Sequence, residues 1–388
     1  MNEPTILQIV PALKTGGVEQ TALDVGHAVS KEGWRSLIAS SGGRMCKEAE
    51  QLGSEHIILP LDTKNPIALL RNTDLLKSVI RSYHVDLLHA RSRAPAWSSL
   101  FAARQTNTPF VTTYHGAYTQ KSWPKKFYNS VMVRGDMVIA NSQWTANLIY
   151  KRHPSASQKI VAIARGIDFS KFDLSVISEE RLMALRQNWN IRESDIIFLN
   201  LARLTHWKGQ SVIIEAARQV ISSYPCARFI LAGDPQGRTD YVDRLQKKIT
   251  EYDLKNHFVL PGHCNDPSAA IALADIIVVA SIKAETFGRT AVEAAAMGKP
   301  VLATRIGAVE ETVCSEPECI HDQNTGWKVK AGNSEEMAIA MNHILSLSMN
   351  TLQEIGTRAR NHVHKFYSVE RMREKTIAVY RSLLTKRK

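Results

Sequence analysis

The chain has 388 residues, 44% of them hydrophobic and 22% charged, which is typical of a soluble globular protein long enough for two domains. Its net charge is +12, and residues 1–170 hold most of the excess, with 20 Lys and Arg against 12 Asp and Glu. A basic N-terminal half suggests an anionic partner, such as an acidic glycan, a nucleic acid or a lipid surface, with a merely solubilising basic face as the alternative.

No stretch of the sequence has the pattern of a secretory leader or a membrane span. The N-terminus carries Glu3 and no basic segment, and the longest apolar run, residues 269–282, is too short to cross a bilayer. The five cysteines are scattered and lack the paired CxxC pattern of a zinc site. We therefore expect a cytoplasmic protein with reduced thiols.

Short apolar runs alternate with amphipathic stretches along the chain. In the first half they predict a helix at 19–33, a helical stretch at 74–82, and strands at 5–10, 36–40, 56–59, 86–89, 110–114 and 137–140. After a polar, irregular stretch at 171–195 the alternation restarts, with strands at 196–201, 228–232, 258–260, 276–280, 301–303 and 326–329. Residues 368–384 predict a terminal helix. The pattern indicates an α/β fold of two Rossmann-like domains with parallel sheets, joined near 166–180.

Two glutamates, Glu285 and Glu293, stand eight residues apart in the second half. Glu285 follows the strand expected at 276–280, and a helix is expected at 291–297. Helix N-termini bind phosphate, Gly288 lets a ligand approach the backbone, and a carboxylate accepts hydrogen bonds from two hydroxyls. The segment is a candidate site for a phosphorylated, polyhydroxylated ligand. The equally weighted alternative is that one glutamate caps a helix, the other lies on the surface, and neither binds a ligand.

Two cations, Arg203 and Lys208, follow the strand expected at 196–201. Open α/β sheets bind ligands outside the carboxyl ends of their strands, so both side chains are placed to converge on a diphosphate. A solvated basic turn is the alternative. Because no Asp-x-Asp motif occurs, we expect these cations to neutralise phosphate charge, with no metal ion or other cofactor.

Two further strand ends of the first half carry polar or flexible residues. Gly16 and Gly17 form a turn onto a helix that fits neither GxGxxG nor a P-loop. His115 closes the strand at 110–114, where it can contact a sugar or a phosphate, although a single histidine is more often structural.

Cations and aromatic residues mix elsewhere in the first half. Arg91 and Arg93 follow the strand at 86–89, and Lys125 and Lys126 lie among aromatic residues at 121–128. These four residues are candidates for binding an anionic acceptor. The 121–128 stretch fits either a membrane interface or an ordinary surface loop that enters a helix.

In this order and spacing, the segments resemble retaining glycosyltransferases of family 4, which have the GT-B fold. The resemblance covers nearly the whole chain. It rests on Glu285 with Glu293, Arg203 with Lys208, Gly16-Gly17, Asn141-Ser142, Gly166-Ile167-Asp168, and Gly307 with Glu310.

The resemblance implies a role for each matching residue. Glu285 would contact donor-sugar hydroxyls, Glu293 would hold the ribose, and Arg203 and Lys208 would stabilise the diphosphate leaving group, with His115 approaching from the first domain. It also implies retention of configuration without a protein nucleophile, the donor phosphate assisting deprotonation of the acceptor, and hinge closure of the two domains. The domains would comprise 1–168 with 368–388, and 169–367. The remaining donor-binding residues would be Gly16, Gly17, Gly262, His263, Phe287, Gly288, Arg289 and Thr290.

Residues 89–93 and 113–117 look like bacterial lipopolysaccharide-core mannosyltransferases. This implies a GDP-mannose donor, an anionic glycolipid or glycan acceptor, peripheral association with the inner face of the cytoplasmic membrane, and no nucleic-acid partner. Thr286 stands where the family often has glycine, which leaves the donor sugar open. The alternatives are a UDP-sugar donor, a nucleotide-sugar epimerase of the same fold, and a non-enzymatic sugar-nucleotide or glycan-binding protein.

Overall fold

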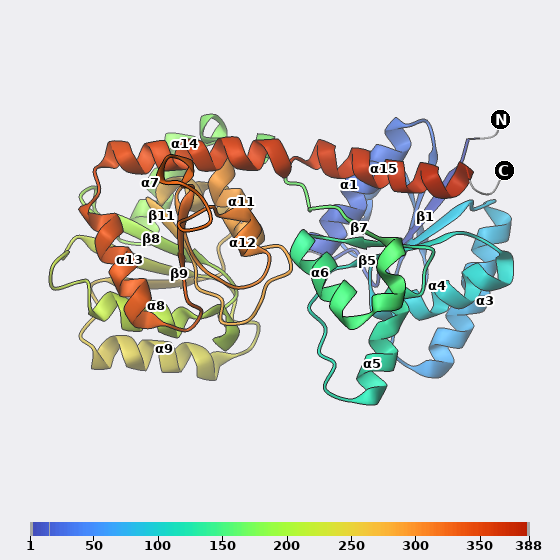
Figure 1. Ribbon diagram of the computed structural model, residues 1–388, viewed down its shortest axis with the longest axis horizontal. Coiled ribbons are helices and arrows are strands. Elements are labelled where there is room, and N and C mark those ends of the chain that lie inside the picture. The colour runs from blue at the N-terminus through green and yellow to red at the C-terminus, as the bar shows by residue number, and fades with distance from the viewer. Residues whose placement is uncertain (1–2, 15, 386–388) are drawn as a thin grey trace. The chain divides into compact units, whose positions relative to one another are not determined.

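The computed structural model describes residues 3–14 and 16–385 and divides into two compact units (Figure 1). Unit 1 comprises Met1–Gly166 with Val369–Lys388, and unit 2 comprises Ile167–Ser368. These boundaries lie within two residues of the predicted ones. Each unit contains one parallel sheet with helices on both sides, as expected from the alternation of strands and helices.

Unit 1 is built on a seven-stranded sheet of order β3-β2-β1-β4-β5-β6-β7. All six strands predicted here are present. The seventh, β7, has only three residues, too few to stand out as a periodic pattern. The strands are β1 (Thr5–Ile9), β2 (Arg35–Ser40), β3 (Ser54–Ile58), β4 (Leu87–Ala90), β5 (Phe110–Tyr114), β6 (Met137–Ala140) and β7 (Ile160–Ala162). The helices are α1 (Gly17–Lys31), α2 (Cys46–Gln51), α3 (Pro66–Ser82), α4 (Arg93–Thr106), α5 (Trp123–Ser130), α6 (Gln143–Arg152) and α15 (Val369–Thr385).

Unit 2 is built on a six-stranded sheet of order β10-β9-β8-β11-β12-β13, and all six predicted strands are present. They are β8 (Ile196–Leu201), β9 (Ala227–Ala232), β10 (Phe258–Gly262), β11 (Ile276–Val279), β12 (Val301–Thr304) and β13 (Gly326–Val329). The helices are α7 (Glu179–Asn188), α8 (Gln210–Arg218), α9 (Thr239–Glu251), α10 (Pro267–Leu273), α11 (Arg289–Ala296), α12 (Val309–Thr312), α13 (Ser334–Ser346) and α14 (Met349–Phe366).

The strand order reverses once in each sheet, between β1 and β4 in unit 1 and between β8 and β11 in unit 2. At such a switch point the loops leave toward opposite faces of the sheet, so a crevice opens at the carboxyl ends of the strands. The predicted site residues follow these strands: Arg203 and Lys208 follow β8, and Glu285 follows β11.

Helix α7 lies in the stretch 171–195 that was expected to be irregular, so this expectation was wrong. None of its residues is buried, which explains why no apolar stripe marks it in the sequence. An ion pair stabilises it, because Arg181 donates from Nε and Nη2 to the two carboxylate oxygens of Asp266, each over 2.7 Å. Asp266 also caps α10 by accepting from the Ala269 amide.

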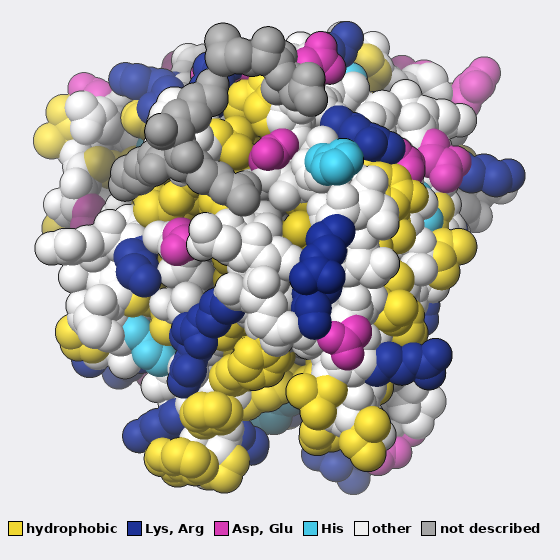
Figure 2. Space-filling view, turned by 90° about the vertical axis from the view of Figure 1, so that its right-hand side faces the viewer, with side chains coloured by type: hydrophobic (Ala, Val, Ile, Leu, Met, Phe, Trp, Pro, Cys, Tyr) yellow, Lys and Arg dark blue, Asp and Glu magenta, His cyan; other side chains and the backbone are white. Residues whose placement is uncertain are grey.

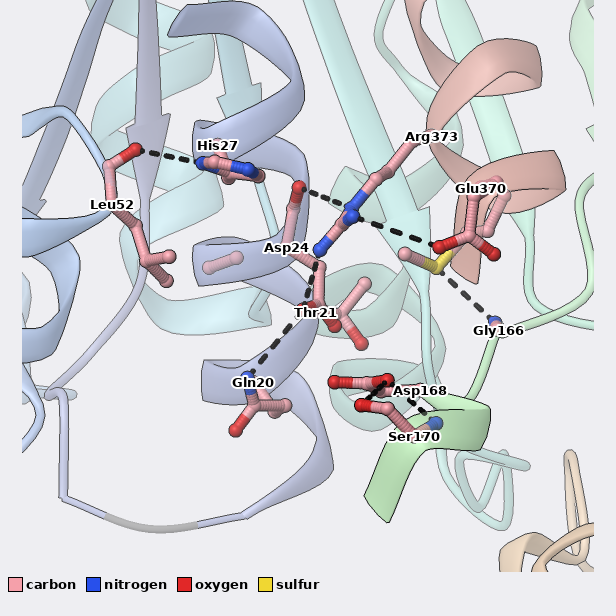
Figure 3. A network of polar contacts seen from close by, with 12 residues as sticks. Gln20, Thr21, Asp24, His27, Leu52, Gly166, Asp168, Ser170, Glu370 and Arg373 are labelled. Carbon is pink, nitrogen blue, oxygen red and sulfur yellow. Dashed lines mark hydrogen bonds and ion pairs between the residues drawn. The ribbon is translucent and has the colours of Figure 1, made fainter. Parts of the chain in front are cut away.

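The terminal helix α15 belongs to unit 1, where it packs against α1. Met372, Ile377 and Tyr380 join a buried cluster with residues of β1, α1 and β4. On the polar side, Arg373 donates from Nε to the carbonyl of Asp24 over 3.1 Å, and Nη2 lies 3.4 Å from the Asp24 carboxylate (Figure 3). The chain end is thus fixed to the first helix of the same unit.

All five cysteines are free thiols in the structure. Across residues 3–14 and 16–385, no helix combines the length and the apolar character needed to cross a membrane.

Candidate active site

In unit 2 the loops after β8 and β11 meet at the switch point. Gly209, which precedes α8, has a left-handed backbone (φ 74°), and a Cβ there would lie 1.9 Å from the carbonyl oxygen of Ala280. The Ile282 amide donates to the carbonyl of Trp207 over 2.8 Å. Because any side chain at Gly209 would push the loops apart, glycine at this position keeps the two loops in contact.

Lys208 and Glu285, which come from these two loops, form an ion pair. Nζ of Lys208 donates to Oε1 of Glu285 over 2.6 Å, and the side chains are only 14% and 15% exposed. The hydroxyl of Ser281 donates to the same oxygen. Ser281 is itself fixed, because the Thr304 hydroxyl donates to its carbonyl over 2.7 Å. An ammonium group has three N–H donors and a carboxylate two oxygens, so both keep further bonding capacity for a ligand.

Arg203 lies on the surface beside this pair. Its guanidinium carbon lies 5.8 Å from the centre of the Trp207 ring. Nζ of Lys208 lies 4.5 Å from the same centre, so both cations contact one indole. Nη1 of Arg203 donates to Oε1 of Gln236 over 3.4 Å, and its carbonyl accepts from the buried amide of Gln210 over 3.1 Å. The structure thus brings the two cations together, with one of them exposed to solvent.

Glu293 lies about one turn inside α11, which begins after Gly288. Nε of Arg289 donates to Oε1 of Glu293 over 2.5 Å; the arginine side chain is 45% exposed and the glutamate only 9%. Burial raises the pKa of the Glu293 carboxyl above its usual range, and the positive charge of Arg289 opposes this shift. Gly288 is left-handed (φ 73°), and a Cβ there would lie 2.6 Å from Cγ2 of Val309.

The other residues of this segment hold its backbone in place. The Phe287 ring is 4% exposed, and the Thr290 hydroxyl donates to the carbonyl of Leu201 over 3.2 Å. Gly307 also has a left-handed backbone (φ 79°), and it forms a β-bridge with Glu285. A Cβ at Gly307 would lie 2.4 Å from the carbonyl oxygen of Glu285. Phe287 and Thr290 therefore fix the backbone at the start of α11.

Gly262 and His263 were both expected to bind the donor. Gly262 ends β10, and His263 follows it at the same edge of the sheet. Gly262 accepts from the Gly233 amide over 2.7 Å and has a left-handed backbone (φ 76°) with open space where a Cβ would be. His263 is exposed. Strands β9 and β8 separate this stretch from β11, so it lies to one side of the Lys208–Glu285 pair.

In unit 1, Gly16 precedes and Gly17 begins α1, the helix that follows β1 after a loop, and the neighbouring residue 15 lies outside the described residues. His115, directly after β5, is half-buried, and its Nδ1 lies 2.7 Å from Nη2 of Arg165. Burial lowers the pKa of His115 well below its usual range, and the positive charges of Arg165 and Arg91 lower it further. Because arginine only donates, Nδ1 must accept, so the neutral ring carries its proton on Nε2.

One of the four expected acceptor contacts, Arg91, needs correction. Arg91 is only 2% exposed, and its Nε and Nη2 both donate to Oε1 of Gln8, over 2.9 and 2.6 Å, so it is an internal residue and presents no charge to an acceptor. Arg93 is half-buried and donates from Nη1 to Asn129 over 2.8 Å, which anchors α5. Lys125 and Lys126 are exposed on α5.

Comparison with known proteins decides the family. Residues 183–362 match the family model "Glycosyl transferases group 1", and residues 15–171 match "Glycosyltransferase Family 4". The crystal structure of a glycosyltransferase from Rickettsia africae ESF-5 is 34% identical to this chain, covers 99% of both chains and has a TM-score of 0.88. The chain belongs to the GT-B glycosyltransferases.

Other relatives agree with this. The putative glycosyltransferase EpsD of Bacillus subtilis (strain 168) is 27% identical over 320 residues, which is 79% of this chain and 78% of EpsD. The structure of Anabaena HepE in complex with UDP and glucose has a TM-score of 0.82, is 24% identical, and covers 98% of this chain and 100% of that chain. The expected GT-B fold is confirmed.

Three residues that contact the candidate site residues were not singled out from the sequence. Ser281, which hydrogen-bonds Glu285, reads only as an interruption of an apolar run. Trp207 lies between the two predicted cations, and Arg165 follows the short β7. The available signal was position: each lies shortly after the carboxyl end of a parallel strand.

A hollow of about 910 Å³ in unit 2 adjoins this site at Trp207 and lies between the loop after β8 and helix α9. Trp207, Arg238, Tyr241 and Lys248 are among its lining residues, whereas none of the predicted site residues lines it. Within the described part of the chain, no group of three or more His, Cys, Asp or Glu side chains is arranged to hold a metal ion.

Proposed function

We propose that this glycosyltransferase is a retaining enzyme that moves a hexose from a nucleotide-sugar donor to a glycan acceptor of the cell envelope. The observation that supports the proposal most strongly is the Lys208–Glu285 ion pair at the switch point of unit 2. It places a cation and a carboxylate side by side, as needed to bind a phosphate and the hydroxyls of the sugar attached to it.

The donor chemistry follows from these groups. Arg203 and Lys208 would neutralise the diphosphate and stabilise the negative charge that develops on it as the leaving group. Glu285 would accept hydrogen bonds from sugar hydroxyls, and Glu293 from the ribose. In the free protein, Lys208 and Glu285 neutralise each other. Donor binding would replace their contact, so that Lys208 contacts the phosphate and Glu285 accepts from the sugar.

Retention of configuration is proposed without a protein nucleophile. Oε1 of Glu285 already accepts from both Lys208 and Ser281, which suits a group that orients hydroxyls rather than one that attacks carbon. The donor phosphate would assist removal of the acceptor proton on the same face of the sugar. In unit 1, neutral His115 would donate a hydrogen bond from Nε2, which makes it a sugar contact in this proposal.

For the donor we propose mannose from GDP-mannose, on the resemblance of residues 89–93 and 113–117 to lipopolysaccharide-core mannosyltransferases. A UDP-sugar is the competing donor, since the HepE structure holds UDP and glucose. The acceptor would be a lipopolysaccharide-core or related anionic glycan, in keeping with the excess of Lys and Arg in residues 1–170.

A thermal-shift screen of GDP-, UDP- and ADP-sugars tests the donor site. A donor at a hundred times its Kd raises the melting temperature of a unit of this size by about 5–10 °C. We expect one nucleotide class to do so with the native chain and to lose most of the effect with Lys208→Met. If no sugar nucleotide shifts the transition, or if Lys208→Met responds as the native chain does, the donor site is wrongly placed.

A further inference from the structure

The hollow beside Trp207 in unit 2 has the size of a small-molecule site. Helices α8 and α9 pack side by side, and the hollow lies where the turn before α8 faces α9 (Figure 1). Its volume of about 910 Å³ is within the range of known ligand pockets. Because none of the residues proposed to hold the donor lines it, the hollow is a second space beside the donor site.

Three aromatic side chains line the hollow. His206 and Trp207 belong to the turn before α8, and Tyr241 lies in the first turn of α9. The rings of His206 and Tyr241 are parallel to within 3°, with centres 6.4 Å apart, so a flat ring that stacks on one is parallel to the other as well. The Tyr241 hydroxyl donates to Oε1 of Gln210 over 3.2 Å, which fixes the ring. Aromatic side chains that stack on a base hold nucleotides with little regard to which base it is.

The lining also carries positive charge that is left for a ligand. Both of its lysines, Lys247 and Lys248, form ion pairs with glutamates of α8 and α9. Within residues 3–14 and 16–385, by contrast, no ion pair engages Arg238 or Arg244, and both are exposed. The lining includes two acids. One is a partner of these lysines, and the other, Asp240, lies in the first turn of α9, where the helix dipole stabilises its charge.

Cations alone do not mark a binding site, because Lys and Arg side chains are scattered over the surface, as the face in Figure 2 shows. The hollow differs in combining guanidinium groups with aligned rings. A guanidinium group binds phosphate through paired N–H donors, and Arg238 directly precedes α9, whose N-terminus attracts phosphate as well. A flat ring linked to phosphate uses both features, and this is the chemistry of a nucleotide.

Two side chains connect the hollow to the cations of the donor site. The Trp207 ring lines the hollow and contacts both Arg203 and Lys208. Gln236 accepts through Oε1 from Arg203 over 3.4 Å and from Arg238 over 3.3 Å. A ligand that stacks in the hollow and binds Arg238 therefore acts on the surroundings of both donor-site cations.

We propose that the hollow binds a nucleotide as an effector distinct from the donor. Its base stacks on the rings of His206 and Tyr241, and its phosphate pairs with Arg238 and Arg244. The bound negative charge cancels part of the positive potential that attracts the donor diphosphate, so donor affinity falls by about twofold to fivefold. This last step rests on the proposed function of the donor site, whereas binding in the hollow does not.

Calorimetric titration of the full chain with AMP tests the binding and needs neither donor nor acceptor. Tyr241→Leu removes a stacking ring and Arg244→Glu reverses a charge, and each should weaken AMP binding by about tenfold. Tyr241→Phe keeps the ring and should bind AMP as the native chain does. Matched controls outside the hollow are Tyr252→Leu and Lys255→Glu, which should also bind normally. Thermal unfolding checks that each variant is folded.

Two comparisons show where AMP binds and which parts of it are recognised. Lys208→Met disables the donor site and should bind AMP as the native chain does. Ribose 5-phosphate lacks the base and adenosine lacks the phosphate, so each should bind at least about tenfold more weakly than AMP. The proposal is overturned if AMP does not bind at millimolar concentration or if Lys208→Met abolishes binding. It is also overturned if Tyr241→Leu and Arg244→Glu bind as the controls do, or if ribose 5-phosphate binds as tightly as AMP.

The effect on the donor is measured by titrating the donor that the thermal-shift screen selects, with and without saturating AMP. Donor binding should weaken by about twofold to fivefold in the native chain and stay unchanged in Arg244→Glu. An equal loss in both proteins would be competition at the donor site, and no loss in the native chain would exclude an effector role. Failure to find any donor would contradict the proposed function and leave the AMP titrations as they stand.

Discussion

Replacing Lys208 by methionine removes the ammonium group that faces Glu285 and keeps the bulk of the side chain. The structure predicts two separate consequences. The Glu285 carboxylate, 15% exposed, loses its countercharge and keeps the hydrogen bond from Ser281, so we expect unfolding of unit 2 to become easier by about 2–3 kcal/mol, less than for a fully buried pair. Turnover should fall by about 10²-fold or more, because the leaving diphosphate loses a positive charge.

The double variant Lys208→Met/Glu285→Gln distinguishes stability from catalysis. Neutralising Glu285 removes the unpaired charge. The double variant should therefore be more stable than Lys208→Met alone, by about 1 kcal/mol or more. Its activity should remain as low as that of the worse single variant, since both groups act on the donor. Stability thus recovers and catalysis does not.

Urea unfolding is measured for the native chain, for Lys208→Met, for Glu285→Gln and for the double variant. Steady-state kcat/KM is measured for the same proteins with the donor that the thermal-shift screen selects. A strictly additive loss of stability would show that the ion pair of the structure does not persist in solution. A near-normal kcat/KM for Lys208→Met would refute its placement at the leaving group.

Three further predictions concern neighbouring residues. Burial raises the pKa of Glu293, and its ionised form is the one proposed to accept from ribose hydroxyls, so donor affinity should fall with decreasing pH earlier than for an ordinary glutamate. Arg289→Met removes the charge that opposes the shift and should move this loss to still higher pH in titrations of Kd. Gly209→Ala should lower the free energy of unfolding of unit 2 by about 3 kcal/mol or more, because its Cβ meets a carbonyl oxygen. Gly262 has the same left-handed backbone, but the space for a Cβ is open, so Gly262→Ala should cost about 1–2 kcal/mol in urea unfolding. Ser281→Ala should lower kcat by about tenfold and change KM less, because the hydroxyl orients Glu285. Ser281→Thr keeps a hydroxyl and should restore part of the rate. An equal loss of kcat in both variants would leave Ser281 without a positioning role.

The sheets could be predicted from the sequence because buried parallel strands such as β11 are short apolar runs rich in β-branched residues. The strand ends then place Arg203, Lys208 and Glu285 at one edge without any knowledge of side-chain contacts. Helix α7 was missed because it buries no residue, and its stability comes from the Arg181–Asp266 pair between segments distant in the sequence.

Side-chain burial was the harder part to predict. Arg91 looks in the sequence like a cation at a strand end, as Arg203 does, yet it is buried on Gln8 whereas Arg203 is exposed. The difference arises from what packs above each strand end, and Gln8, on the adjacent strand β1, is far from Arg91 in the sequence. A pattern within one segment carries no information about such a partner.

The central claim, retaining sugar transfer at the unit 2 site, is tested most directly by proton NMR of the product formed from an α-linked sugar nucleotide and a glycan acceptor. We predict an α-linked product, released nucleoside diphosphate in equal amount, and product formation slowed by about 10²-fold or more with Lys208→Met. A β-linked product would contradict retention. An epimerised sugar nucleotide formed without acceptor would contradict transfer itself.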